Sequence, residues 1–189
     1  MSKKILVVFH NLNIEGAPTM LVKAVKVLLD ADFLIEALSL EGGAYEEELG
    51  RMGIPLNICE TTVSPMAEFD SYVKQFDLII ANTVITYQLI ARYNNTVPIM
   101  WYIHEGKTIQ TLFSNNIKGL DSLLKEKTNI VEVSESVRDW LESEYGIKNI
   151  AVLHNYIDMD EKADYLNGIV RKTGEKVRFT YLGSIDPHK

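Results

Sequence analysis

The sequence predicts an α/β fold with a doubly wound, mostly parallel, Rossmann-like sheet. Short β-branched apolar runs alternate with segments of helical periodicity along nearly the whole chain. Several of these runs are almost continuously apolar, which is typical of parallel strands buried on both faces. The chain has 189 residues, 47% of them hydrophobic and 24% charged, which fits a globular domain with its own core.

The first three strand–helix units lie between residues 4 and 75. We expect strands over 4–10, 32–40 and 54–59, and helices over 18–30, 44–52 and 65–75. Pro18 suits the first turn of its helix, because its missing N–H would have no partner there. Gly53 is placed to end the second helix as a C-terminal cap.

The alternation continues in the second half of the chain. We expect strands over 77–82, 98–104, 129–134 and 149–155, and helices over 84–93, 109–126 and 135–145. Ser134 can cap the last of these helices, and Gly146 can end it. After residue 155 the pattern changes to a polar helix over 160–173 and a fresh strand over 176–183, so we expect the natural protein to continue into a second domain.

Composition and short motifs exclude several functions. The net charge of −7 and pI of about 5.1 disfavour binding to nucleic acid. One cysteine cannot form an internal disulfide, which fits a cytoplasmic protein, and no apolar run approaches the length of a membrane span. The sequence has no G-x-G-x-x-G fingerprint for NAD or FAD, no phosphate loop, no nucleophile elbow and no metal-ligand spacing of histidines.

Polar residues gather where the predicted strands end. Ligands of open α/β sheets bind beyond the carboxyl ends of the strands, where the strand order reverses, and we expect strands 4–10 and 77–82 to flank that crevice. The polar residues at the strand ends are His10, Asn11, Asn13, Asn82, Thr83, Thr86, His104, Glu105, Ser134, His154 and Asn155. The alternative explanation is that turns are polar in any protein, and that His104 is satisfied by nearby backbone.

The loop over 13–18 leads into a helix whose N-terminus faces the predicted crevice. Unpaired N–H groups and the helix dipole favour a phosphate there, and Gly16 would let a ligand approach the backbone. A plain tight turn would explain the same residues.

Four segments together resemble the N-terminal domain of a family 4 glycosyltransferase with the GT-B fold. They are NIEGAPTML (13–21), WYIHEG (101–106), VEVSESVRDWL (131–141), and VLHNYID (152–158) followed by FTYLGSIDPHK (179–189). The order and spacing of these segments cover nearly the whole chain. The resemblance implies an acceptor-side domain over 1–155, an interdomain segment over 156–175, and the first strand and turn of a donor-binding domain over 176–189.

The resemblance also implies an activity. Such enzymes transfer a sugar, with retained configuration and without an essential metal or cofactor, from a nucleoside diphosphate sugar to a saccharide or lipid-linked acceptor. Cell-surface polysaccharide synthesis in the cytoplasm, with peripheral contact at the inner face of the membrane, is the expected setting. Because half of the active site would lie in the second domain, we expect the chain alone to be inactive. The alternatives are a GT-B epimerase or phosphorylase, or a non-catalytic α/β ligand-binding module.

Individual roles follow from the same resemblance. His104 would be catalytic, touching the donor sugar near the reacting centre. Gly16, Ala17 and Lys189 would bind the donor, because a departing diphosphate needs dipoles and cations. The candidates for the acceptor cleft are Asn11, Asn82, Thr83, Glu105 and Ser134. Three positions depart from the family pattern: Glu15 interrupts the usual glycine pair, Ser184 replaces a phosphate-binding Arg, and Tyr156 replaces a glycine.

Overall fold

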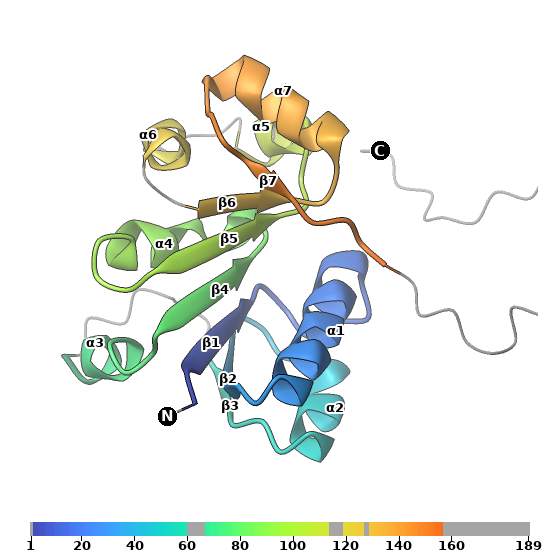
Figure 1. The fold of residues 1–189 in the computed structure, drawn as a ribbon, viewed down its shortest axis with the longest axis vertical. Helices are drawn as coiled ribbons and strands as arrows, with labels where there is room; N and C mark the ends of the chain where they lie inside the picture. Colours follow the sequence, from blue (N-terminus) through green and yellow to red (C-terminus); the bar gives the residue numbers. More distant parts are fainter. Residues whose placement is uncertain (1, 60–66, 114–118, 127–128, 157–189) are drawn as a thin grey trace, which may run out of the picture. The chain divides into compact units, whose positions relative to one another are not determined.

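The computed structural model describes residues 2–59, 67–113, 119–126 and 129–156. In that part of the chain, seven parallel strands form one sheet in the order β3-β2-β1-β4-β5-β6-β7 (Figure 1). The strands are β1 (Lys4–Phe9), β2 (Leu34–Ser39), β3 (Leu56–Ile58), β4 (Leu78–Asn82), β5 (Ile99–Ile103), β6 (Asn129–Glu132) and β7 (Ala151–Val152). The predicted fold class is therefore confirmed.

The strand order reverses between β1 and β4. The chain moves outward from β1 through β2 to β3 and then returns to place β4 on the other side of β1. Pairing joins Ile5 to Leu78 and Val8 to Ala81, so the two strands run in register for most of their length. The predicted switch point is confirmed, and it sits where α/β sheets of this kind bind ligands.

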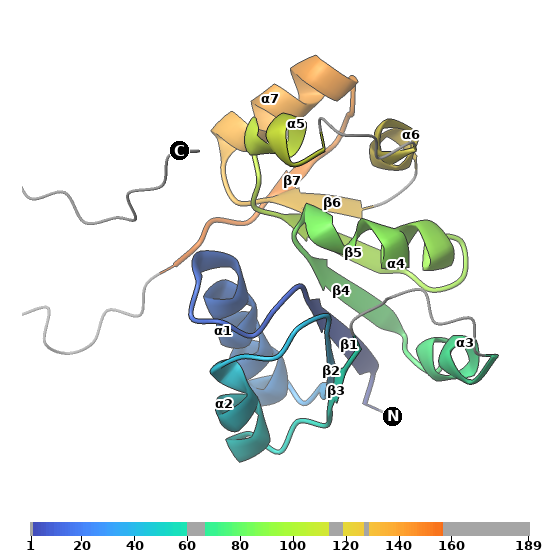
Figure 2. The ribbon, with the colours of Figure 1, turned by 180° about the vertical axis from the view of Figure 1, so that it is seen from behind.

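Helices cover both faces of the sheet (Figures 1 and 2). On one face lie α1 (Gly16–Asp30) and α2 (Tyr45–Arg51), whose apolar residues share a core with β1 and β2. The other core takes residues from α3 (Ala67–Val73), α4 (Tyr87–Tyr93), α5 (Thr108–Phe113), α6 (Leu120–Lys125) and α7 (Glu135–Tyr145). None of the helices in the described residues is long and apolar enough to cross a membrane.

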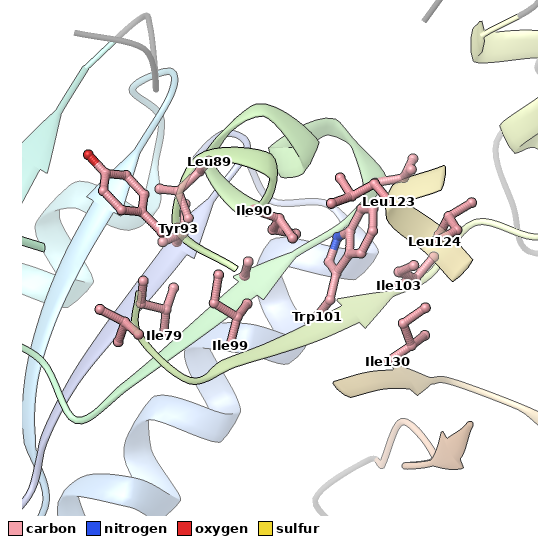
Figure 3. Close-up of a cluster of buried hydrophobic side chains, with 14 of the residues drawn as sticks. Ile79, Leu89, Ile90, Tyr93, Ile99, Trp101, Ile103, Leu123, Leu124 and Ile130 are labelled. Carbon is pink, nitrogen blue, oxygen red and sulfur yellow. The ribbon is translucent and has the colours of Figure 1, made fainter. Parts of the chain in front are cut away.

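Alternation along β5 explains how the second core forms. Ile99, Trp101 and Ile103 point to the same face because successive side chains of a strand alternate, and all three are almost completely buried. Figure 3 shows them packed between β4 and β6, under side chains of α4 and α6 such as Ile90 and Leu124. Burying a side chain of this size stabilises the fold by about 1.5–3 kcal/mol.

Local backbone geometry corrects three of the expected elements. The single helix predicted over 109–126 is wrong, because Gly119 has φ 99°, which no α-helix accommodates, and it separates α5 from α6. The helix predicted over 84–93 begins as a 3₁₀ turn (Val84–Thr86) after Thr83, whose φ is also positive. The strand predicted over 149–155 is reduced to β7, and its late start follows from Asn149, whose φ of 64° does not fit a strand.

Helix α7 begins and ends where the sequence predicts. The Val137 N–H donates to Ser134 Oγ at 3.4 Å, and Gly146 ends the helix with φ 66°, so both predicted caps are confirmed.

Residues Met1–Tyr156 form one compact unit. The helix predicted over 160–173, the strand over 176–183 and the predicted departure at Ser184 lie outside the described residues.

Candidate functional site

The candidate site lies at the carboxyl edge of the sheet. Because all strands run parallel, their last residues and the residues that follow them reach the same edge: Asn11 follows β1, Asn82 ends β4 and Thr83 follows it, His104 and Glu105 follow β5, and Ser134 follows β6. The Ser134 hydroxyl already caps the N-terminus of α7 by accepting the Val137 N–H. The remaining residues differ sharply in how accessible they are.

Thr83 forms a strained turn at the end of β4. Its φ of 66° and ψ of 161° are unfavourable for a β-branched residue and cost about 1–3 kcal/mol. Hydrogen bonds hold this conformation: the Thr83 N–H donates to the Tyr102 carbonyl at 2.8 Å, and the Thr83 carbonyl accepts from Trp101 Nε1 at 2.8 Å, from Thr86 Oγ1 at 2.9 Å and from the Thr86 N–H at 3.4 Å. The surrounding core therefore imposes the turn on this residue.

The side chains of Asn82 and Thr83 are buried rather than exposed to the crevice. Asn82 is 0% exposed and Thr83 is 2% exposed. Both amide atoms of Asn82 and the hydroxyl of Thr83 lack a hydrogen-bond partner among the described residues. Buried polar groups are usually hydrogen-bonded, so unpaired polar atoms of this kind at the end of β4 are unusual. Their contact with an acceptor stays a prediction, and it would require them to become accessible.

Glu105 ties the ends of β4 and β5 together. Its Oε2 accepts hydrogen bonds from the backbone N–H of Val84 at 3.2 Å and of His104 at 3.1 Å. Burial raises the pKa of Glu105, and these backbone hydrogen bonds oppose part of that rise. One carboxylate oxygen is therefore committed to the protein's own backbone, and a direct contact between Glu105 and an acceptor remains a prediction.

Two histidines stand close together at this edge, both neutral at physiological pH. Burial lowers the pKa of His104 to about 4, with a smaller contribution from the nearby His10. Burial also lowers the pKa of His10, although Glu15 and Glu41 oppose the shift. The His104 ring packs edge-on against Tyr102, with the ring centres 4.4 Å apart, and its Nε2 has no partner among the described residues. A neutral imidazole in this place can exchange hydrogen bonds without adding charge.

Sequence reasoning missed Glu132, the last residue of β6. Its side chain is completely buried, and neither carboxyl oxygen has a partner within the described residues. Burial, together with the nearby charge of Glu105, raises the pKa of Glu132 to about 9, so it is a neutral acid at pH 7. The signal was present in the sequence, because a lone acidic residue interrupts the apolar strand NIVEV.

Gly16 is the first residue of α1, next to the carboxyl end of β1. A Cβ added to Gly16 would meet no atom within 4 Å, and its φ lies outside the left-handed region, so neither packing nor backbone geometry in the described residues calls for glycine. Asn11 stabilises the loop that leads into α1. Its Oδ1 accepts the Asn13 N–H at 3.0 Å, and its Nδ2 donates to Glu15 Oε2 at 3.4 Å. Ala17 follows in the first turn. Lys189 lies outside the described residues.

A pocket of about 590 Å³ opens at the same edge, over the ends of β1 to β4. Its lining comes from segments that are distant in sequence: His10, Asn11, Leu40, Glu41, Gly42, Ile58 and Ile85. Of the residues predicted at the crevice, His10 and Asn11 line it; Gly16, Asn82 and His104 do not. The pocket therefore opens at the edge of the sheet where the sequence predicts a crevice, but its remaining lining residues are ones that the sequence did not indicate: Leu40, Glu41, Gly42, Ile58 and Ile85.

A close backbone approach shapes this pocket. The loop after β1 lies against the loop after β2, where the Tyr45 N–H donates to the Leu12 carbonyl at 2.9 Å and the Leu12 N–H to the Gly42 carbonyl at 3.4 Å. A Cβ on Gly43 would overlap the carbonyl carbon of Leu12 and would lie 2.6 Å from the backbone nitrogen of Asn13. Only glycine fits at this position, so Gly43 holds two walls of the pocket together.

The architecture is that of glycosyltransferases of known structure. The chain superposes on Alr3699/HepE of Anabaena in complex with UDP-glucose, with a TM-score of 0.64 and 18% identity over 82% of this chain and 44% of that one. It also matches a glycosyltransferase of Rickettsia africae (TM-score 0.55, 16% identity, 82% and 43% covered). An alpha-glucosyltransferase in complex with UDP and DNA gives a TM-score of 0.56 at 11% identity, with 84% and 44% covered. These identities establish the shared fold.

The family itself follows from the sequence. The family model of glycosyl-transferase family 4 matches residues 1–155, and the chain belongs to that family. No curated protein matches the sequence. The chain spans less than half of the length of these three solved structures. Among the described residues, no three His, Cys, Asp or Glu side chains are grouped to hold a metal ion.

Proposed function

We propose that this chain is the acceptor-side part of a glycosyltransferase that takes a sugar from a nucleoside diphosphate sugar. The main support is the carboxyl edge of the sheet, where the pocket, the neutral histidines and the start of α1 surround the switch point between β1 and β4. Membership of glycosyl-transferase family 4 is consistent with this assignment. Three structures of the similar Anabaena protein contain UDP, UDP-glucose, or UDP and glucose.

The residues divide into two groups by their chemistry. Gly16 and Ala17 begin a helix of 15 residues, whose free N–H groups and dipole favour the negative charge of a departing diphosphate. Lys189 would add a cation to that side. His104, neutral and partly buried, would hydrogen-bond to the donor sugar without repelling the positive charge that develops at its reacting carbon.

We further infer the finer features from the resemblance. The reaction would retain the anomeric configuration and use no metal or cofactor, and the acceptor would be a saccharide or a lipid-linked saccharide in cell-surface polysaccharide synthesis. The enzyme would work in the cytoplasm and contact the inner face of the membrane where its acceptor is lipid-linked. The solved structures are more than twice as long as the part that they share with this chain, so we expect the 189-residue chain alone to be inactive.

Substitution of His104 tests the proposal in the full-length protein. His104→Ala should lower kcat/KM for sugar transfer by roughly 10- to 100-fold, because it removes one positioned polar contact to the reacting sugar. His104→Gln, which keeps hydrogen-bonding capacity, should recover part of the loss. The measurement is release of nucleoside diphosphate coupled to product analysis across a panel of donors.

A control separates chemistry from folding. Asp30 is the exposed last residue of α1, at the opposite end of that helix from Gly16, so Asp30→Ala should leave transfer unchanged. Thermal unfolding of both variants should stay close to that of the wild type. Transfer by a folded His104→Ala protein at the wild-type rate would remove the role assigned to this residue.

A further inference from the structure

The charge of the pocket over β1 to β4 indicates what kind of acceptor it takes. Glu41 lines the pocket, and Glu15 Oε2 lies 3.9 Å from Nε2 of His10, another lining residue. His10 adds no positive charge at neutral pH, because burial lowers its pKa. The lining residues in the described part of the chain include no Lys or Arg. The pocket therefore presents a negative potential to any ligand that enters it.

One side of the same pocket is apolar. Leu40, Ile58 and Ile85 line it, and Ile58 and Ile85 are 47% and 41% exposed, unusually high for isoleucine. Asn11 supplies an amide on the polar side. A pyranose ring has the matching character, with C–H groups on its faces and hydroxyls around its edge. The volume of about 590 Å³ also lies within the range of pockets that bind small molecules.

Anionic ligands would be disfavoured in this place. A carboxylate or a phosphate would lose hydration and would face Glu41 without a compensating cation among the described lining residues. The diphosphate of the donor, or of a lipid-linked acceptor, would therefore lie outside the pocket. The start of α1 offers such a group backbone N–H donors and the positive end of the helix dipole.

We propose that this pocket is the acceptor subsite and that it selects a saccharide ring carrying no carboxylate or phosphate. The inference rests on the proposed transferase function and adds the chemical class of the acceptor ring. Glu41 acts as a specificity-determining residue, because its carboxylate repels an anionic sugar, while Ile58 and Ile85 contact the C–H face of an accepted ring.

Matched acceptors that differ by one charge test the proposal. The full-length protein is assayed with a panel of nucleoside diphosphate sugars and with two acceptor pairs: methyl β-glucoside against methyl β-glucuronide, and methyl β-galactoside against methyl β-galacturonide. The neutral member of each productive pair should have at least a tenfold higher kcat/KM than the uronide. The ratio should shrink as ionic strength rises, because salt screens the repulsion.

Variants assign the selectivity to the pocket. Glu41→Gln has nearly the same shape, and it should raise the relative kcat/KM for the uronide by roughly five- to tenfold through loss of one nearby charge. Glu142→Gln makes the same change in net charge on the exposed surface of α7, away from the pocket, and should leave the ratio within about twofold. This control separates a local effect from the overall charge of the protein.

The outcomes distinguish the two levels of inference. Absence of transfer from every donor to every acceptor would refute the proposed function itself. Transfer with equal or better use of the uronide would leave the transferase proposal standing and overturn the acceptor assignment. Equal effects of Glu41→Gln and Glu142→Gln on the ratio would also overturn it, whereas a shift confined to Glu41→Gln would support the subsite.

Discussion

Replacing Gly43 with alanine should destabilise the domain by forcing apart two loops that shape the pocket. The added Cβ would overlap the carbonyl carbon of Leu12 and would lie 2.5 Å from its oxygen and 2.6 Å from the nitrogen of Asn13. All three atoms belong to the backbone, so no side-chain rotation can relieve the clash. Overpacking of this kind typically costs about 1–3 kcal/mol.

The clash would also disturb the hydrogen bonds that join the loops. The Leu12 carbonyl accepts from the Tyr45 N–H at 2.9 Å, and the Leu12 N–H donates to Gly42 at 3.4 Å. Losing the stronger of these adds about 1 kcal/mol. We therefore expect Gly43→Ala to lower the free energy of unfolding by about 2–4 kcal/mol, which corresponds to a fall in Tm of roughly 5–15 °C for a domain of this size.

Two neighbouring glycines provide graded controls. A Cβ on Gly42 would meet the end of the flexible Glu46 side chain, whose Oε1 accepts the Gly43 N–H at 2.7 Å, so Gly42→Ala should cost only about 1 kcal/mol. A Cβ on Gly50, inside α2, would meet nothing within 4 Å, so Gly50→Ala should be neutral or stabilising by up to about 1 kcal/mol. Urea unfolding of the three variants measures the series. A Gly43→Ala protein as stable as Gly50→Ala would refute the reasoning.

Two further predictions concern Gly16 and Glu132. Gly16→Ala should leave stability unchanged, because its Cβ would lie in open space, yet should raise KM for the donor of the full-length protein roughly tenfold; unaltered donor kinetics would contradict the role of this helix start. Burial holds the pKa of Glu132 at about 9, so the folded state keeps a proton that the unfolded chain releases above about pH 4.5, and stability falls as pH rises between these values. Glu132→Gln should remove this fall, on the order of 1 kcal/mol per pH unit, when urea unfolding is compared at pH 5 and pH 8, whereas Glu126→Gln on the exposed surface should keep it. Equal slopes for the wild type and Glu132→Gln would contradict the buried acid.

The sequence by itself determined the architecture and the edge of the sheet at which a crevice is expected. Apolar periodicity is a local property, so it reveals strands and helices, and their alternation implies a parallel sheet. The order of the elements then placed the switch point between β1 and β4, and the cap residues predicted α7 from Ser134 to Gly146. The residue types at the strand ends indicated a polar crevice.

Only the tertiary structure decided which residues form the site. The pocket joins His10, Glu41, Ile58 and Ile85, which come from four separate segments of the chain, and no local pattern relates positions so far apart. Burial of Asn82, and the overlap that excludes a side chain at Gly43, are likewise set by segments that pack from elsewhere in the chain. Pocket shape, accessibility and pKa depend on distances through space, whereas a sequence pattern reports distances along the backbone.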